Sequence, residues 1–180
     1  DRPHLVATSF GGRIAAHLAS TYPERFASLT LIVPAGLRGD GPRPDPFRQT
    51  PREAIDRLTN DRADRIPSLD IDTTDHEFIV ESYREDTAFA LFTFTERYDR
   101  DLPHRLGRIG IPTLVLDAEE DRVLGAGAAQ RYADLIPSAR HVVIDGPVEG
   151  EASSHAMHVE QFVDISAVVL QHISDAEERN

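Results

Sequence analysis

Short runs of apolar residues alternate along this chain with stretches in which apolar residues recur at helical spacing. The runs are rich in leucine, isoleucine and valine and lack polar alternation, which is typical of parallel strands covered on both faces. We predict such strands at residues 5–6, 29–33, 111–116 and 141–144. Helical spacing follows at residues 14–19, 127–135 and 162–173. The alternation predicts an α/β fold with a parallel sheet of about four strands and flanking helices.

The first strand leads directly into a turn that carries a serine and then into a helix. The residues are Ala7-Thr8-Ser9-Phe10-Gly11-Gly12. Small residues on both sides of Ser9 avoid a clash across a tight turn, and the two glycines let the backbone fold back closely. This is the context of the G-x-S-x-G nucleophile elbow, here with alanine in place of the first glycine. Backbone N–H groups at the start of the helix would stabilise an oxyanion. The same residues also fit an ordinary turn with a surface serine.

A long segment of different character separates the second strand from the third. Residues 38–46 combine glycine, proline and charged residues, which indicates a loop. Thr50 then stands where a helix N-cap is expected, with Pro51 at the first helical position and Glu53 at the capping-box position. Residues 38–105, called the insert below, are therefore predicted to be helical and separate from the strands around them.

A second and longer helix is predicted within the insert, with Thr74 as its N-cap. Its apolar positions are Phe78, Ile79, Tyr83, Ala88, Leu91 and Phe92. The insert also holds five of the eight phenylalanines, namely Phe47, Phe78, Phe89, Phe92 and Phe94. These rings would either line a pocket or pack the insert against the rest of the fold, and packing is the more frequent role of aromatic residues.

Composition limits both the chemistry and the partners. The 180 residues suffice for one domain with a sizeable core. The absence of cysteine excludes disulfides, thiol catalysis and zinc–thiolate sites. The net charge is −12 and all 19 basic residues are arginine, so we expect neither nucleic acid nor an anionic membrane as a partner. No apolar run reaches the length of a membrane span and no signal peptide is visible. We expect a cytoplasmic protein without a metal or cofactor.

Three residues of types that cooperate in nucleophilic catalysis each follow a predicted strand. Ser9 follows the first strand, Asp121 the third and His155 the fourth. The order Ser…Asp…His, with each residue at the carboxyl end of a strand, is that of the α/β-hydrolase triad. Rival acids in the same turn are Asp117, Glu119 and Glu120. The spacing from the strand favours Asp121.

Four stretches resemble the α/β-hydrolase fold family. The family's nucleophile elbow, with its helix and next strand, is matched by HLVATSFGGRIAAHLASTYPERFASLTLIVPAGL. The strand and turn that hold the triad acid are matched by LPHRLGRIGIPTLVLDAEEDRVL. The next helix and the final strand are matched by RYADLIPSARHVVID, and the histidine loop by HAMHVEQF. The chain resembles the C-terminal two-thirds of a cap-bearing serine hydrolase of the esterase and carbon–carbon-bond hydrolase group. The resemblance implies a core of residues 1–37 and 106–180 and a helical cap of residues 38–105.

Roles for individual residues follow from the resemblance. Ser9 would be the nucleophile, His155 the general base and then the general acid, and Asp121 the group that orients the imidazole. The backbone N–H of Phe10 would donate to the oxyanion. His158 would support or pack beside His155, and it replaces His155 in the triad if the loop is rearranged. A serine at the elbow, where related enzymes use aspartate, implies hydrolysis of a small ester or of a ketone carbon–carbon bond.

The chain also departs from the family pattern. Ala7 and Ala118 stand where the family usually has glycine, and residues 146–155 replace a shorter G-x-G-H loop. The family's first four strands, with the loop of the second oxyanion donor, would precede Asp1, leaving the first strand as an open edge. We therefore expect a fragment of a serine hydrolase with a small-molecule substrate, completed by its N-terminal segment or by a second copy. The alternative is an inactive hydrolase-like binding module.

Overall fold

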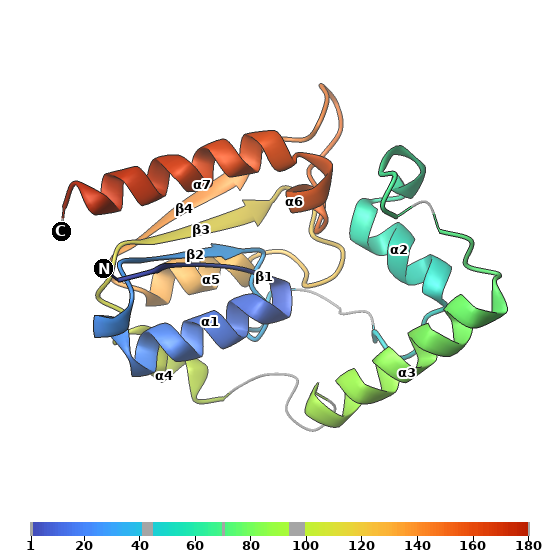
Figure 1. Cartoon of the computed structure of the whole chain (residues 1–180), viewed down its shortest axis with the longest axis horizontal. Coiled ribbons are helices and arrows are strands. Elements are labelled where there is room, and N and C mark those ends of the chain that lie inside the picture. Colours follow the sequence, from blue (N-terminus) through green and yellow to red (C-terminus); the bar gives the residue numbers. More distant parts are fainter. Residues whose placement is uncertain (1, 41–44, 70, 94–99, 180) are drawn as a thin grey trace.

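A four-stranded sheet forms the centre of the molecule. The computed structural model describes residues 2–40, 45–69, 71–93 and 100–179. Within these ranges the strands are β1 (His4–Thr8), β2 (Ser28–Ile32), β3 (Thr113–Ala118) and β4 (Ala139–Ile144). All pairings are parallel, and strands adjacent in sequence are adjacent in the sheet (Figure 1). The predicted α/β class and four-stranded parallel sheet are confirmed.

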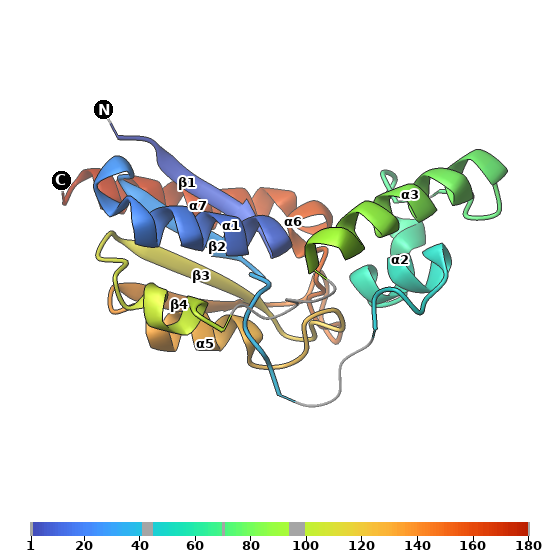
Figure 2. The ribbon, with the colours of Figure 1, turned by 90° about the horizontal axis from the view of Figure 1, so that it is seen from below.

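Helices cover both faces of the sheet, so each inner strand is buried on both sides. One face packs against α1 (Ser9–Thr21), α4 (Leu102–Leu106) and α5 (Ala128–Leu135). The other packs against α6 (Met157–Glu160) and α7 (Phe162–Glu177) (Figure 2). Successive side chains of β3 point to opposite faces, so Val115 joins the first core while Leu114 and Leu116 join the second. This two-sided burial explains the uninterrupted apolar runs in the sequence.

Two helices of the insert lie beyond the carboxyl ends of the strands (Figures 1 and 2). These are α2 (Pro51–Thr59), followed by the short 3₁₀ helix η2 (Ala63–Arg65), and α3 (His76–Thr93). Another 3₁₀ helix, η1 (Pro23–Arg25), follows α1. The sequence-based boundary between residues 105 and 106 falls inside α4, whose two leucines belong to the core. The division into core and cap stays a prediction.

The first helix of the insert begins as the sequence predicts. The backbone N–H of Thr50 donates to Glu53 Oε2 at 2.7 Å, and the N–H of Glu53 donates back to Thr50 Oγ1 at 3.3 Å. This reciprocal pair is the expected capping box, with Pro51 at the first helical position. Such caps depend on residues a few positions apart, which is why sequence alone can predict them.

The predicted N-cap of the second helix is wrong by one residue. Asp75, not Thr74, caps α3, because its Oδ2 accepts the N–H of Phe78 at 2.9 Å. Thr74 instead donates its own N–H to Asp72 Oδ1 at 2.9 Å. Threonine and aspartate are both favoured N-cap types, so the choice between adjacent residues depends on which competing hydrogen bond forms.

The predicted apolar face of α3 is partly exposed, and so is one apolar residue predicted to lie on the covered side of α7. Ile79, Tyr83 and Leu91 of α3 are 43 %, 75 % and 83 % exposed, and Phe162 at the start of α7 is 63 % exposed. Periodicity identifies the apolar side of a helix but not whether another element lies against it. Phe94 and the side chain of Phe92 lie outside the described residues.

Strand β1 forms one edge of the sheet. Among the described residues its only strand partner is β2, and Val6 is 44 % exposed.

The described helices include none that combines the length and apolar character needed to cross a bilayer.

A buried histidine predicts acid sensitivity of the fold. His172 of α7 is 6 % exposed, and burial lowers its pKa, although hydrogen bonds to the backbone of Leu29 and Pro112 oppose this. Below about pH 6.5 the unfolded chain therefore binds a proton that the folded chain resists, and stability is lost as the pH falls. We expect His172→Gln to reduce the decline of the unfolding free energy below pH 6.5, by at most about 1.4 kcal/mol per pH unit. Urea unfolding at pH 7.5, 6.5 and 5.5 measures this; an unchanged decline would contradict it.

Candidate functional site

Ser9 lies at a sharp turn where β1 ends and α1 begins. Its φ angle is +49°, which lies in the left-handed region that residues other than glycine rarely adopt. Such strain persists only where the surroundings hold it, and it occurs often at active sites. Here the carbonyl of Ser9 accepts the N–H of Ala35 at 2.9 Å, which ties the turn to the segment after β2. The strand–turn–helix predicted for the elbow is present.

The two glycines after Ser9 have different roles, whereas the sequence suggested the same role for both. A Cβ at Gly12 would lie 2.9 Å from Pro34 Cβ, closer than Cβ atoms pack, and 3.1 Å from Pro34 Cα, which is also a tight contact. A Cβ at Gly11 would lie 3.9 Å from Ala7 Cβ, an ordinary contact. The close approach of α1 to the chain after β2 therefore requires Gly12. Ala7 is accommodated in place of glycine.

This difference predicts opposite effects of two neighbouring substitutions. Gly12→Ala should lower the unfolding free energy by about 1–3 kcal/mol, because the rigid proline ring must move. Gly11→Ala should leave it unchanged or raise it by up to about 1 kcal/mol, because alanine is the better helix former. Urea unfolding of the two variants measures both effects. Equal stability of the two variants would contradict the packing described.

Ser9, His155 and Asp121 form one chain of hydrogen bonds. The Nε2 atom of His155 lies 2.9 Å from Ser9 Oγ, and its Nδ1 lies 2.8 Å from Asp121 Oδ2. The side chains of His155 and Asp121 are 4 % and 6 % exposed. When Nδ1–H donates to the carboxylate, Nε2 is left free to accept the hydroxyl proton of Ser9. The structure thus brings together the three residues that the sequence selected.

Asp121 is held in place by the turn that follows it. Its second oxygen, Oδ1, accepts the N–H groups of Val123 and Leu124, each at 2.8 Å. One carboxylate oxygen therefore fixes the side chain to the backbone while the other faces His155. Both oxygens are used in a nearly dry environment, which keeps the imidazole orientation fixed.

The rival acids contact other residues. Asp117 lies 3.1 Å from Nε2 of His141, and burial raises the pKa of its carboxyl, although the hydrogen bond with His141 opposes this. The remaining rivals have the following partners: Glu119 accepts the N–H of Ser153, and Glu120 accepts from Arg122. The carboxylate hydrogen-bonded to His155 belongs to Asp121.

His158 lies next to His155 but does not take its place at Ser9. Burial lowers the pKa of His158, the nearby His155 ring lowers it further, and a hydrogen bond to the backbone of His155 opposes both. Its Nδ1 has no partner among the described residues. The supporting role expected for His158 stays a prediction.

A cavity of about 260 Å³ opens beside the serine and lies between the sheet and the insert. The residues that line it from the sheet side are Ser9, Phe10, Arg13, Ala35, Gly36, Leu37, Val123, Leu124 and His155. From the insert come Pro46, Gln49, Ala54, Arg57, Leu58, Phe89 and Thr93. Apolar side chains dominate and a few polar groups lie among them, as in many sites for small molecules.

Aromatic rings join the insert to the nucleophile turn. Phe89 of α3 meets Phe10 edge-to-face, with ring centroids 5.3 Å apart and planes at 86°. Phe47 lies 6.1 Å from the same Phe89 ring. For Phe89 both expectations hold, since it lines the cavity and packs against the sheet domain. The backbone N–H of Phe10 belongs to the first turn of α1, where amides have no acceptor within the helix.

Sequence reasoning missed two polar residues of the insert that approach the segments of the acid and the histidine. Asn60 and Arg62, just after α2, contact the segments around Asp121 and His155. No motif marks them, because their partners lie far away in sequence. Among the described residues, no cluster of three His, Cys, Asp or Glu side chains could hold a metal ion.

Comparison with known proteins shows the family of the chain. Residues 1–166 match the model of a family described as "Alpha/beta hydrolase family". The chain belongs to the alpha/beta hydrolase family. Among solved members of this fold, the 2-hydroxy-6-oxo-6-phenylhexa-2,4-dienoate hydrolase from Rhodococcus sp. strain RHA1 superposes with a TM-score of 0.71. It is 20 % identical, and the match covers 96 % of this chain and 64 % of that one.

Two curated relatives that match this chain carry different enzyme names. Monoacylglycerol lipase abhd6-B of Xenopus laevis is 30 % identical over 163 residues, 79 % of this chain and 48 % of the lipase. A 2-hydroxy-6-oxononadienedioate/2-hydroxy-6-oxononatrienedioate hydrolase of Paraburkholderia phymatum is 26 % identical over 153 residues, 77 % of this chain and 53 % of the hydrolase. The chain spans about half the length of the curated relatives it matches.

Proposed function

We propose that this chain carries the catalytic site of a serine hydrolase that transfers an acyl group to water. The observation that carries the proposal is the hydrogen-bonded chain from Ser9 through His155 to Asp121, which opens into a cavity lined mainly by apolar side chains. A serine on a strained turn, a base within hydrogen-bond reach and a carboxylate that orients the base are the parts that nucleophilic catalysis needs.

The reaction proceeds in two acyl-transfer steps. Ser9 Oγ attacks the carbonyl carbon of the substrate while His155 Nε2 takes the hydroxyl proton. The tetrahedral intermediate collapses, the bond to the leaving group breaks, and His155 gives its proton to that group. Water then attacks the acyl-serine with His155 again as base, and the acid and free Ser9 are released. Asp121 stabilises the imidazolium in both steps.

The oxyanion of the intermediate needs backbone donors. The N–H of Phe10 at the start of α1 supplies one, aided by the helix N-terminus. Removal of one oxyanion donor typically costs about 10²–10³-fold in rate. Because the matched relatives are about twice as long, we propose that a further N-terminal segment pairs with β1 and supplies the second donor.

The proposed substrate is a small ester, or a ketone whose carbon–carbon bond is cleaved by water. The cavity volume and its apolar lining support a compact and mainly apolar acyl group. Both reaction types occur by name among the relatives, as a monoacylglycerol lipase and an oxononadienedioate hydrolase. The test is hydrolysis of p-nitrophenyl butyrate by the natural full-length protein, compared with its Ser9→Ala variant. Absence of ester turnover together with absence of fluorophosphonate labelling of Ser9 in the unsubstituted protein would instead favour a hydrolase-like binding module.

A further inference from the structure

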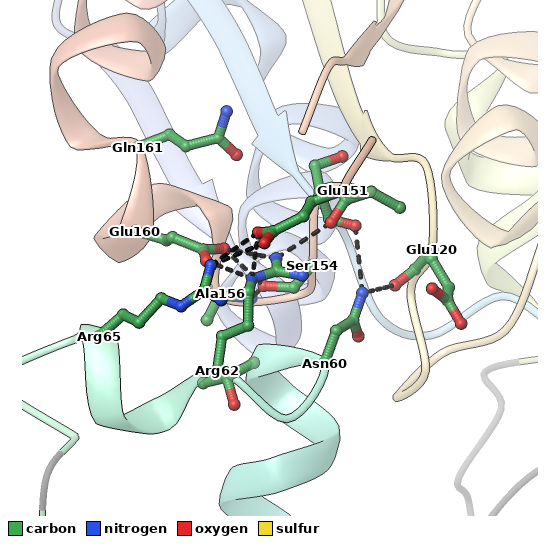
Figure 3. Close-up of polar contacts among 12 residues, drawn as sticks. Asn60, Arg62, Arg65, Glu120, Glu151, Ser154, Ala156, Glu160 and Gln161 are labelled. Atoms are coloured by element: carbon green, nitrogen blue, oxygen red, sulfur yellow. Dashed lines mark hydrogen bonds and ion pairs between the residues drawn. The ribbon is translucent and has the colours of Figure 1, made fainter. Parts of the chain in front are cut away.

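An arginine of the insert lies buried against the segment that carries His155. Helix α2 ends at Thr59, and the next two residues, Asn60 (φ +51°) and Asp61 (φ +65°), have positive φ angles. This tight exit from the helix directs the next residue, Arg62, toward the histidine segment (Figure 3). Arg62 is only 8 % exposed, which is unusual for an arginine unless it is paired.

Arg62 contacts the chain on both sides of His155. Its Nε donates to Glu160 Oε1 at 2.6 Å and its Nη2 donates to Glu160 Oε2 at 2.9 Å, which makes a two-pronged ion pair. The same Nη2 donates to the carbonyl of Ala152 at 3.0 Å. Ala152 precedes His155 and Glu160 follows it, so one guanidinium fixes both flanks of the histidine.

Neighbouring residues of the insert reinforce this contact. The N–H of Ala156, directly after His155, donates to the carbonyl of Leu58 at 2.9 Å. The side-chain amide of Asn60 donates to the carbonyl of Glu120 at 3.0 Å, next to Asp121. The end of α2 therefore touches the segments of both the acid and the base.

From the sheet side, the histidine segment is held mainly before His155. The hydroxyl of Ser153 donates to the carbonyl of Ile144 and accepts the N–H of Glu119 at 2.8 Å. Gly146 allows the preceding loop to close, because a Cβ there would overlap the backbone of Glu151. The segment is thus enclosed between the sheet and the insert, and Arg62 forms the buried charged contact on the insert side.

We propose that Arg62 is a positioning residue for His155, which couples the placement of the insert to the geometry of the Ser9–His155–Asp121 chain. The proposal rests on the proposed function, since it concerns the rate of that reaction. Arg62 does not line the cavity, so its removal should affect the alignment of the base more than the binding of substrate. A displacement of about 1 Å at a catalytic group can cost about 10²-fold in rate.

The test compares steady-state kinetics with p-nitrophenyl butyrate for several variants of the natural full-length protein. We expect Arg62→Met to lower kcat by about 10²-fold while KM changes by less than about threefold. Arg62→Lys keeps the charge but loses the two-pronged geometry, and should recover part of the rate. The matched control is Arg65→Met, because Arg65 contacts Glu151 of the same segment but its side chain is 57 % exposed. That variant should stay within about twofold of the unsubstituted protein.

A double variant separates positioning from stability. Replacing Arg62 and Glu160 together by methionine removes both buried charges of this ion pair, so that neither is left without a partner. Removing both partners of a buried pair often restores stability. We expect the urea midpoint to recover in this double variant while kcat remains low. If kcat returns with the stability, or if Arg62→Met raises KM alone, the positioning role is wrong. The Ser9→Ala variant in the same assay distinguishes failure of the positioning role from failure of the proposed function. Undiminished turnover by Ser9→Ala would overturn the proposed function itself.

Discussion

Replacement of Ser9 by alanine is expected to lower kcat for p-nitrophenyl butyrate by about 10⁴–10⁶-fold. The reason is the geometry of the turn: Ser9 Oγ is the atom that lies 2.9 Å from the basic nitrogen of His155. Without the hydroxyl, no group at this position can form the acyl intermediate. The residual rate would come from oxyanion stabilisation and binding alone.

A matched substitution controls for general effects on the fold. Ser174 is an exposed serine of α7, far from the elbow in sequence, and Ser174→Ala should leave kcat and KM unchanged. Stability of both variants is compared by urea unfolding. Turnover that persists undiminished in Ser9→Ala would show that another residue is the nucleophile.

Asp121→Asn is expected to lower kcat by about 10⁴-fold with little change in fold. The asparagine carbonyl oxygen can still accept the N–H groups of Val123 and Leu124, as Oδ1 does now. Its amide nitrogen then faces Nδ1 of His155, where a hydrogen-bond donor favours the wrong imidazole tautomer. The proton therefore sits on Nε2, and the ring can no longer accept the proton of Ser9.

Asp117→Asn is the control for this prediction. Asp117 is a half-buried aspartate of the same strand end, but it contacts His141 rather than His155. We expect the kcat of the Asp117→Asn variant to stay within about tenfold of that of the unsubstituted protein. Circular dichroism and urea unfolding establish that both variants are folded. Similar losses in the two variants would mean that local charge, rather than the orientation of His155, controls the rate.

Local signals in the sequence predicted much of this structure. The apolar runs predicted the strands because both faces of the sheet are covered, and the Thr50–Glu53 capping box involves residues only three apart. The small residues around Ser9 predicted a tight strand–turn–helix, and the steric role of Gly12 against Pro34 gives that prediction its physical basis.

Features that depend on distant contacts could not be read from the sequence. The exposure of Tyr83 and Leu91 depends on where α3 lies relative to the sheet, which periodicity does not encode. The choice between His155 and His158 depended on how residues 146–155 fold back. In the structure Gly146 and Ser153 close that loop and direct His155 toward Ser9.

The contact between Arg62 and Glu160 is a further example. The two residues are 98 positions apart, and neither belongs to a recognisable motif. Their pairing depends on the left-handed exit from α2 and on the placement of α6, so it becomes visible only in three dimensions. The insert is therefore more than a cover for the cavity, because it also contacts the segment that carries the base.

The central claim, that Ser9 is the nucleophile of this site, is tested most directly by locating a covalent adduct. The natural full-length protein is treated with a fluorophosphonate probe, digested, and examined by tandem mass spectrometry, alongside its Ser9→Ala variant. We predict a phosphonyl adduct on Ser9 and none in the Ser9→Ala protein. An adduct on a different residue, or equal labelling of the variant, would contradict the claim.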